Sequence, residues 1–331
     1  MSEIRYDVVG IGNAIVDIIG HCDDAFLAQH GAPKGHMRLV DAHVATKLYD
    51  AMGPAVEISG GSAANAMVGI ASFGGRAAFI GKVADDEFGR IFAHDIRASG
   101  VAFDTPPALG GAPTARSLIL VTPDGERTMN TFLGVSPELN RGEVDDTVVR
   151  AAQIVYLEGY LFDRPEAKEA FRQAAEIATK ADRKVALSLS DSFCVGRHRA
   201  EFLALIRSHI DILFANEREI TALYETGSFD EAVRRVQTDT ALAVLTRSAK
   251  GSVVVANGSA LSIPAEPVMQ VVDATGAGDL YAAGFLFGVA TGCKLEVAAQ
   301  LASLAAAEII SHIGARPIKP LAALARGRGL L

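Results

Sequence analysis

The stretch VVDATGAGDLYAAGFLFG, residues 271–288, sets three residues with almost no side chain in front of an apolar, helix-forming run. Gly276, Ala277 and Gly278 stand where this helix is expected to begin, and Asp279 follows at once. The first N–H groups of a helix lack partners within the helix, and the helix dipole favours negative charge beside them. The stretch therefore predicts an anion-binding site made of backbone amides.

Asp279 allows two interpretations. An aspartate in the first turn of a helix is common, because the helix dipole stabilises its charge. A carboxylate held beside bound phosphates would instead bind protons more strongly than usual. That property suits a general base that takes a proton from an attacking hydroxyl. The motif by itself leaves both interpretations open.

Two other phosphate-binding fingerprints are missing from the chain. No Gly-Lys-Ser or Gly-Lys-Thr occurs, so there is no phosphate loop of that type. Gly10 and Gly12 lie at the end of a predicted strand, but Ile15 occupies the third glycine position of the dinucleotide fingerprint. A dinucleotide-dependent oxidoreductase is therefore disfavoured.

Short β-branched runs alternate with alanine-rich amphipathic runs along most of the chain. Helices are expected at 62–74, 86–100 and 165–181, and strands at 6–12, 76–83, 152–159, 184–190, 210–216, 242–248 and 251–257. Such alternation predicts an α/β fold of three layers, with a central, mostly parallel sheet and helices on both of its faces.

Two segments, 14–41 and 111–135, break this alternation with strand-like runs that have no long helix between them. Pro123-Asp124-Gly125 in the second segment is a strong hairpin signal. We expect the two segments to form a small β-sheet lid. The large α/β domain would then comprise 1–13, 42–110 and 136–331.

Composition restricts the class of protein. The 331 residues carry a net charge of −8, which disfavours general binding to nucleic acid. The three cysteines follow no metal-binding spacing and suit a reducing compartment. The N-terminal apolar run contains charged residues and resembles neither a signal peptide nor a membrane span. We expect a cytoplasmic protein without a membrane partner.

Two motifs together resemble the signatures of the ribokinase/PfkB-type carbohydrate and nucleoside kinases. They are DATGAGD (273–279) and the glycine-rich segment GGSAANAMVGIASFGGRAAFIGKVADDEFG (60–89), and the likeness extends over about residues 5–318. The resemblance implies a ribokinase-like fold and transfer of the ATP γ-phosphoryl group to a primary hydroxyl. It assigns the catalytic base to Asp279 and the anion hole to Gly276, Ala277 and Gly278.

The same resemblance implies the remaining site residues. Gly60, Gly61, Ser62 and Asn65 would contact the acceptor. The Asn216-x-x-Glu219 motif would act on Mg²⁺ through water. The ATP-binding residues would be Asn216, Thr246, Arg247, Gly251, Thr275, Gly276, Gly278 and His312, although His312 equally suits a packing or capping role. A monovalent cation such as K⁺ is a further expectation near Asp273, Thr275 and Gly314.

The identity of the acceptor depends on GIGNAIVDIIG (10–20), which resembles the adenosine kinase branch of the family. By that likeness Asn13 and Asp17 would face the acceptor, with Asp17 accepting hydrogen bonds from two ribose hydroxyls. Arg127 in the lid would reach the phosphates, and Tyr160 or Phe162 would stack on a base or cover a sugar.

We therefore expect an adenosine kinase that forms AMP in purine salvage, as a monomer or a homodimer. Three alternatives stay open: a kinase for inosine or guanosine, a sugar kinase similar to ribokinase or fructokinase, and a nucleoside-binding regulator without activity.

Overall fold

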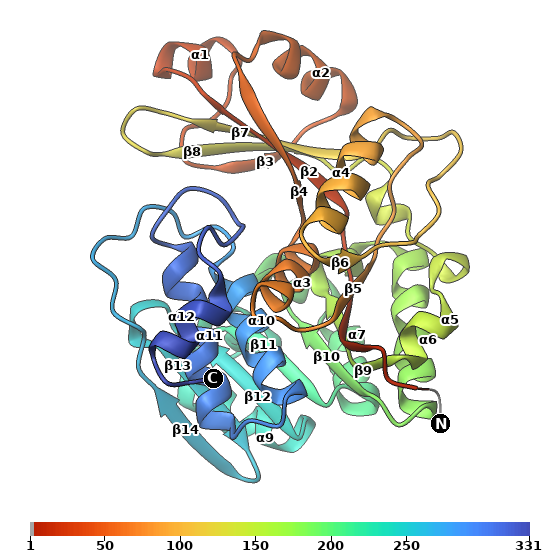
Figure 1. The fold of residues 1–331 in the computed structure, drawn as a ribbon, viewed down its shortest axis with the longest axis vertical. Coiled ribbons are helices and arrows are strands. Elements are labelled where there is room, and N and C mark those ends of the chain that lie inside the picture. Colours follow the sequence, from red (N-terminus) through yellow and green to blue (C-terminus); the bar gives the residue numbers. More distant parts are fainter. Residues whose placement is uncertain (1–2) are drawn as a thin grey trace.

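The computed structural model describes residues 3–331 and contains two sheets (Figure 1). The larger has nine strands in the order β14-β13-β12-β11-β10-β9-β1-β5-β6. Its parallel strands are β1 (Tyr6–Ile11), β5 (Ala77–Ile80), β6 (Val101–Ala102), β9 (Ala152–Glu158), β10 (Lys184–Ser188), β11 (Ile212–Asn216) and β12 (Leu242–Thr246). At one edge β13 (Ser252–Ala256) and β14 (Ser259–Ile263) run antiparallel. The predicted mostly parallel sheet is confirmed.

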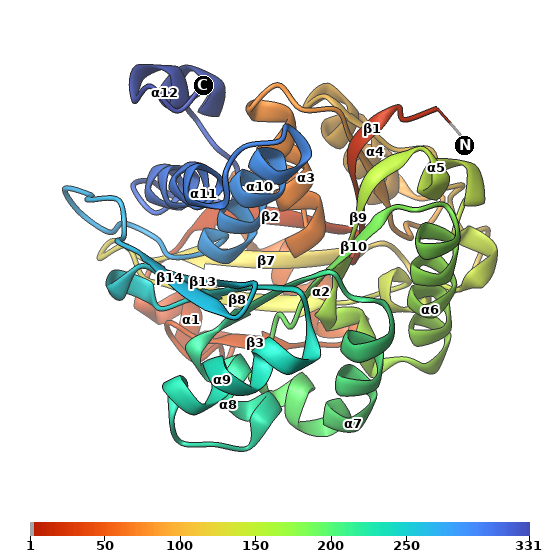
Figure 2. The same ribbon diagram turned by 90° about the horizontal axis from the view of Figure 1, so that it is seen from below.

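Helices cover both faces of this sheet (Figure 2). One face packs on α3 (Ser62–Ser72), α4 (Glu87–Ala98), α10 (Ala277–Ala290), α11 (Leu295–Ile309) and α12 (Leu321–Gly327). The other packs on α5 (Asp146–Arg150), α6 (Pro165–Lys180), α7 (Ser192–His209), α8 (Glu217–Tyr224) and α9 (Phe229–Asp239). Alternate residues of β1 serve the two faces, since Val8 lies in the first core and Val9 in the second. The central strands are mostly apolar because both of their faces are buried.

α10 is buried from Leu280 to Gly288, which explains why its sequence has no polar face. Gly284 allows close packing on α11, because a Cβ atom there would lie 2.6 Å from the carbonyl oxygen of Leu301. This packing fixes the position of the helix, and with it the position of the residues at its N-terminus.

The smaller sheet has the order β3-β8-β7-β2-β4 and is called the lid sheet below. Its strands are β2 (Ile15–His21), β3 (Met37–Leu39), β4 (Ala55–Gly60), β7 (Ala115–Val121) and β8 (Arg127–Phe132). Two helices, α1 (Asp24–Gln29) and α2 (Ala42–Ala51), lie over its outer face (Figure 1). Short 3₁₀ turns complete the fold: η1 (Ser136–Glu138), η2 (Arg141–Glu143), η3 (Gly159–Asp163) and η4 (Ser248–Lys250).

The predicted extent of the lid was too short at one end. From the sequence, residues 42–60 were expected in the large domain, but β4 pairs antiparallel with β2, with Ile15 opposite Gly60. β4 ends at Gly60 and α3 begins at Ser62, so a tight strand-to-helix turn at Gly60 and Gly61 joins the lid sheet to the large unit. Among residues 3–331, no helix has both the length and the apolar composition that crossing a membrane needs.

Candidate active site

Asp279, in the first turn of α10, lies against the start of α3. Its carboxylate accepts a hydrogen bond from Ser62 Oγ at 2.6 Å and another from Asn65 Nδ2 at 3.0 Å. The two glycine-rich motifs, more than two hundred residues apart, therefore meet at one carboxylate. Removal from water raises the pKa of Asp279, while the two hydrogen bonds and the charge of Arg316 act in the opposite direction.

The residues before Asp279 have the geometry of an anion-binding site. Gly276 is the N-cap of α10 at φ 78°, and a side chain there would contact Ala315 at about 3.0 Å. By contrast, apart from its own turn of α10, no atom of the described residues lies within 4 Å of the position that a Cβ of Gly278 would occupy. Among residues 3–331, the amides of Gly278 and Asp279 have no hydrogen-bond acceptor. They are free to bind an anion.

Asp17 on β2 faces the strand-to-helix turn between β4 and α3. A side chain at Gly60 would overlap the carboxylate of Asp17, and one at Gly61, where φ is 100°, would overlap the carbonyl oxygen of Asn13. Burial raises the pKa of Asp17 to about 7, helped by the charge of Asp279 and opposed by Arg316 and Arg127. Both glycines are thus needed for close approach.

Asn13 bonds to protein groups through both polar atoms of its side chain. Nδ2 donates to Glu158 Oε1 at 2.7 Å, and Oδ1 accepts from Ser136 Oγ at 2.9 Å. Glu158 is 1% exposed and also accepts a bond from the amide of Ala63 at 2.8 Å. Burial raises the pKa of Glu158 to about 7. Asn13 therefore helps to hold the turn in place.

Three residues of the site were not expected from the sequence: Glu158, Ser136 and Arg316. The available signal for Glu158 was a single acid at the carboxyl end of a buried strand, where sites form in α/β proteins. Asn65 behaves differently from Asn13, because its buried Oδ1 has no hydrogen-bond partner among residues 3–331. An unpaired buried acceptor is costly, so it favours a ligand that donates a hydrogen bond.

The residues expected to bind ATP are only partly free. Arg247, after β12, pairs with Glu217 at 3.0 Å and lies over the ring of Phe229 at 4.0 Å. Thr246 is half-buried at the end of β12. Gly251 has φ 81°, and a Cβ there would overlap the carbonyl oxygen of Ile263, so the turn between β12 and β13 requires glycine.

Asn216 and Glu219 form a capping box at the start of α8. The amide and Nδ2 of Asn216 donate to the two oxygens of Glu219 at 2.9 and 2.6 Å. Burial raises the pKa of Glu219 to about 7. Within residues 3–331 no group of three or more acidic, histidine or cysteine side chains could hold a metal. With both oxygens engaged, this pair fits a water-mediated contact to Mg²⁺ better than direct coordination.

Asp273 is bonded on three sides. It accepts hydrogen bonds from the amides of Thr275 at 3.0 Å and Gly314 at 3.2 Å, and it pairs with Arg127 Nη1 at 2.6 Å. The guanidinium of Arg127 thus forms an ion pair with the carboxylate near which a monovalent cation was expected. The residues present do not fit such a cation in this arrangement.

His312 is engaged through both ring nitrogens, with Glu308 Oε2 and the carbonyl oxygen of Ile313 each at 3.1 Å. This geometry favours the capping interpretation. Of the two aromatic candidates, Phe162 is buried and stacks on Phe202 at 4.1 Å. Tyr160, on η3, is 45% exposed and is the one available to a ligand. Its pKa is raised by loss of solvation and by nearby carboxylates, among them Asp279.

The known proteins to which this chain is similar are kinases, named either for adenosine or for sugars. A model of the pfkB family of carbohydrate kinases matches residues 47–321. The structure of an adenosine kinase from Sinorhizobium meliloti is 55% identical, with a TM-score of 0.90 over 98% of this chain and 99% of that chain. A probable sugar kinase from Rhizobium etli CFN 42 is 48% identical, with a TM-score of 0.91 over 100% of both chains. A 5-dehydro-2-deoxygluconokinase from Bacillus velezensis is 25% identical over 97% of this chain and 93% of its own length.

Proposed function

Because the chain belongs to the pfkB family of carbohydrate kinases, we propose that it transfers the γ-phosphoryl group of ATP to the 5′-hydroxyl of adenosine, giving AMP and ADP. The observation that carries the transfer itself is the arrangement at the start of α10. There a carboxylate with a raised pKa, Asp279, lies beside amides that have no hydrogen-bond acceptor within residues 3–331. In a cell this activity would serve purine salvage in the cytoplasm.

In the proposed reaction Asp279 accepts the proton of the acceptor hydroxyl while the oxygen of that hydroxyl attacks the γ-phosphorus. A new oxygen–phosphorus bond forms, and the bond from the γ-phosphorus to the bridging oxygen of ADP breaks. The free amides of Gly278 and Asp279 stabilise the negative charge on the transferring group. Ser62 and Asn65 hold the Asp279 carboxylate in place.

Mg²⁺, when bound with ATP, would neutralise charge on the phosphates, and Asn216 and Glu219 would hold its water ligands. No step is assigned to a monovalent cation, because Arg127 already pairs with Asp273. Arg127 is itself the lid residue that we propose for contact with the phosphates, together with Thr246, Arg247, Thr275 and Tyr160 around the nucleotide and acceptor.

The inner face of the lid sheet favours an acceptor with an apolar part. Side chains alternate along a strand, so Ile19 lies on the same face of β2 as Asp17. In register with Ile19 are Val56 on β4 and Ile119 on β7. The row continues to Met129 on β8 and Met37 on β3. We name these five residues the apolar row. It suits a purine base better than a fully hydroxylated sugar.

Asp17 and its neighbours form a second, more polar row on the same face. Ser117 on β7 is in register with Asp17, and Thr131 on β8 is in register with Ser117. Such groups suit the hydroxyls of a ribose ring. The pair of rows therefore matches a nucleoside, as does the strong similarity to an adenosine kinase.

A sugar kinase is the second candidate, supported by the names of the other two relatives and by the polar row. A coupled ADP-release assay should compare adenosine, inosine, guanosine, ribose, fructose and 5-dehydro-2-deoxygluconate. We expect the highest kcat/KM with adenosine. Preference for a sugar would disprove the proposed acceptor while retaining the kinase. Absence of turnover with all of these, together with tight adenosine binding, would favour the regulator.

A further inference from the structure

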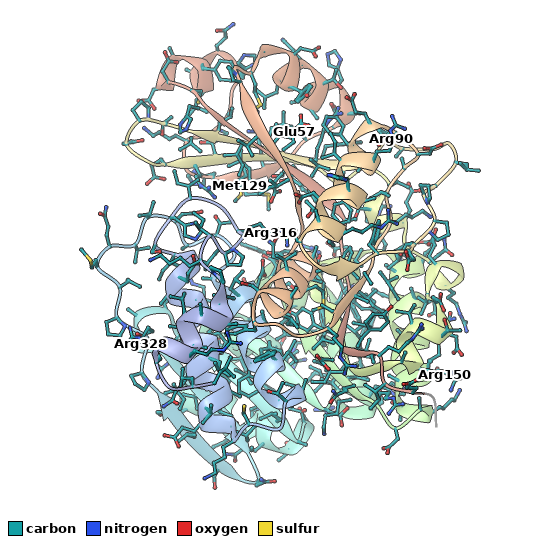
Figure 3. All side chains as sticks on the ribbon, viewed as in Figure 1. Glu57, Arg90, Met129, Arg150, Arg316 and Arg328 are labelled. Carbon is teal, nitrogen blue, oxygen red and sulfur yellow. The ribbon has the colours of Figure 1, made fainter. Side chains whose placement is uncertain are left out.

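Arg316, in the loop after α11, reaches back to the turn that joins the lid sheet to α3 (Figure 3). Its Nε donates to the carbonyl oxygen of Ser59 at 2.9 Å, and Nη2 donates to the same oxygen and to Ser59 Oγ, the latter at 2.8 Å. Nη1 donates to the carbonyl oxygen of Ala64 at 3.0 Å. One side chain therefore fixes the end of β4 relative to the first turn of α3.

All of these acceptors are neutral. Within residues 3–331 no carboxylate forms an ion pair with Arg316, unlike Arg127, whose charge is balanced by Asp273. A guanidinium largely removed from water is unfavourable unless negative charge lies near it. Removal from water lowers the pKa of Arg316 to about 10, and the carboxylates that oppose this effect are Asp17, Asp95 and Asp279.

Asp95 acts through Ser59, because the amide and Oγ of Ser59 donate to Asp95 Oδ2 at 2.7 and 2.6 Å. The other two carboxylates are the ones proposed above to bind and deprotonate the acceptor. Arg316 in turn opposes the rise in pKa of both Asp17 and Asp279. A crosslink between two carbonyl oxygens would not require a charge, so the charge needs a separate explanation.

We propose that Arg316 is a positioning residue of the acceptor site, whose fixed positive charge stabilises the negative charges of Asp17 and Asp279 while its fork holds the Gly60-Gly61 turn against Asp17. The inference rests on the proposed function. The other charged groups facing these two carboxylates are Arg127 from β8 and Glu158 from β9. Glu158 accepts a hydrogen bond from the amide of Ala63 at the start of α3, but it carries no positive charge. Within residues 3–331, Arg316 is the one cation that both contacts the turn and acts on both carboxylates.

The test compares Arg316→Gln, Arg316→Lys and Ser59→Ala with the unaltered protein, through the pH dependence of kcat/KM for adenosine. Gln removes the charge, so the fall in kcat/KM on the acid side should move upward by about one pH unit. KM for adenosine should rise about tenfold, with KM for ATP within about twofold. Lys keeps the charge and should leave the acid side in place, although kcat falls because the fork is lost.

Ser59→Ala is the matched control, because it removes one bond to the guanidinium and the bond from Ser59 Oγ to Asp95 but changes no charge. It should leave the acid side of the profile unmoved. An unshifted profile in Arg316→Gln would overturn the proposal in favour of a crosslinking role. If Arg316→Gln does not fold, Arg316→Met is the second variant without the charge: an upward shift of its acid side would support the proposal, and an unshifted profile would overturn it.

Calorimetric titration of adenosine against the same variants over the same pH range separates this inference from the proposed function. Turnover by the unaltered protein tests the function. A difference in the pH dependence of adenosine binding between the unaltered protein and Arg316→Gln tests the role of Arg316, even without turnover. Equal pH dependence of binding in the two proteins would contradict that role.

Discussion

Arg127 Nη1 lies 2.6 Å from Asp273 Oδ2, with the two side chains 7% and 5% exposed. Arg127 belongs to the lid sheet, and Asp273 precedes the anion-binding turn. The pair therefore connects the lid to the loop in front of α10. Asp273 also accepts hydrogen bonds from the amides of Thr275 and Gly314. The same carboxylate therefore connects the loop before α10 with the loop after α11.

Removing one partner of this buried pair should be strongly destabilising. We expect Arg127→Gln and Asp273→Asn each to lower the free energy of unfolding by roughly 3 kcal/mol, because each leaves a buried charge unpaired. The double variant should lose much less than the sum of the two. Urea unfolding of all four proteins measures this coupling. Arg172→Gln, in an exposed pair with Glu169, is the control and should cost under about 0.5 kcal/mol. Additive losses in the double variant would argue against a direct coupling.

Replacement of the proposed base should abolish turnover without unfolding the protein. Asp279→Asn keeps the size and shape of the side chain, but the amide cannot accept a proton from the hydroxyl. We therefore expect kcat to fall about 10³-fold. Affinity for ATP, measured by calorimetry, should change little. Ser62→Ala removes only the 2.6 Å bond to the carboxylate and should lower kcat by about tenfold. Turnover of Asp279→Asn near that of the unaltered protein would disprove the assignment.

Gly278 allows a test in which stability and activity change independently. Apart from its own turn of α10, a Cβ at this position meets no atom of the described residues within 4 Å, and alanine favours a helix more than glycine does. Gly278→Ala should therefore keep or raise the free energy of unfolding, by up to about 1 kcal/mol. Its methyl group would intrude on the anion-binding site, so kcat should fall about a hundredfold. Gly196→Ala, at an open position in α7, is the matched control and should leave kcat unaltered.

The pKa of Asp17, about 7, predicts how activity depends on pH. Above this pH the carboxylate is ionised and can accept hydrogen bonds from the acceptor, whereas below it the proton must first be lost. We expect kcat/KM for adenosine to decrease by up to tenfold for each pH unit below about 7. The contribution of Asp17 to the free energy of unfolding changes with pH in the opposite direction to activity. Because folding raises this pKa, the contribution of Asp17 is fully present below the ordinary pKa and is lost as the pH rises through 7.

Pre-steady-state and steady-state rates measured from about pH 5.5 to about pH 9 would test the activity profile. Asp17→Asn should lower kcat/KM for adenosine about a hundredfold and remove the contribution of this group. A profile without any acid-side fall in the unaltered protein would contradict the role given to Asp17.

The apolar row predicts a difference between acceptors. Ile19→Asn removes apolar surface from the inner face of the lid sheet, so KM for adenosine should rise about tenfold while KM for ATP stays constant. Ile18→Val, on the buried opposite face of β2, is the control and should affect stability alone. Equal effects of the two variants on KM for adenosine would show that the row does not contact the acceptor.

Local features of the chain were predictable because short segments encode them. The glycines at 276 and 278 predicted where α10 begins, because glycine suits the backbone at a helix terminus. The anion-binding site was predictable because the first amides of a helix lack partners. The parallel sheet follows from regular alternation of apolar runs. The end of the lid at β4 was missed because only the tight turn at Gly60 and Gly61 separates that strand from α3.

The sequence by itself determined the fold class, the two glycine-rich motifs and the candidate base, since each depends on neighbouring residues. Only the tertiary structure decided that Asp273 pairs with Arg127, that Glu158 holds Asn13, and that Arg316 fixes the turn at Ser59. These contacts join residues 145 or more positions apart. A charged side chain carries no local sign of its partner, because the partner is chosen by the order and register in which the strands assemble.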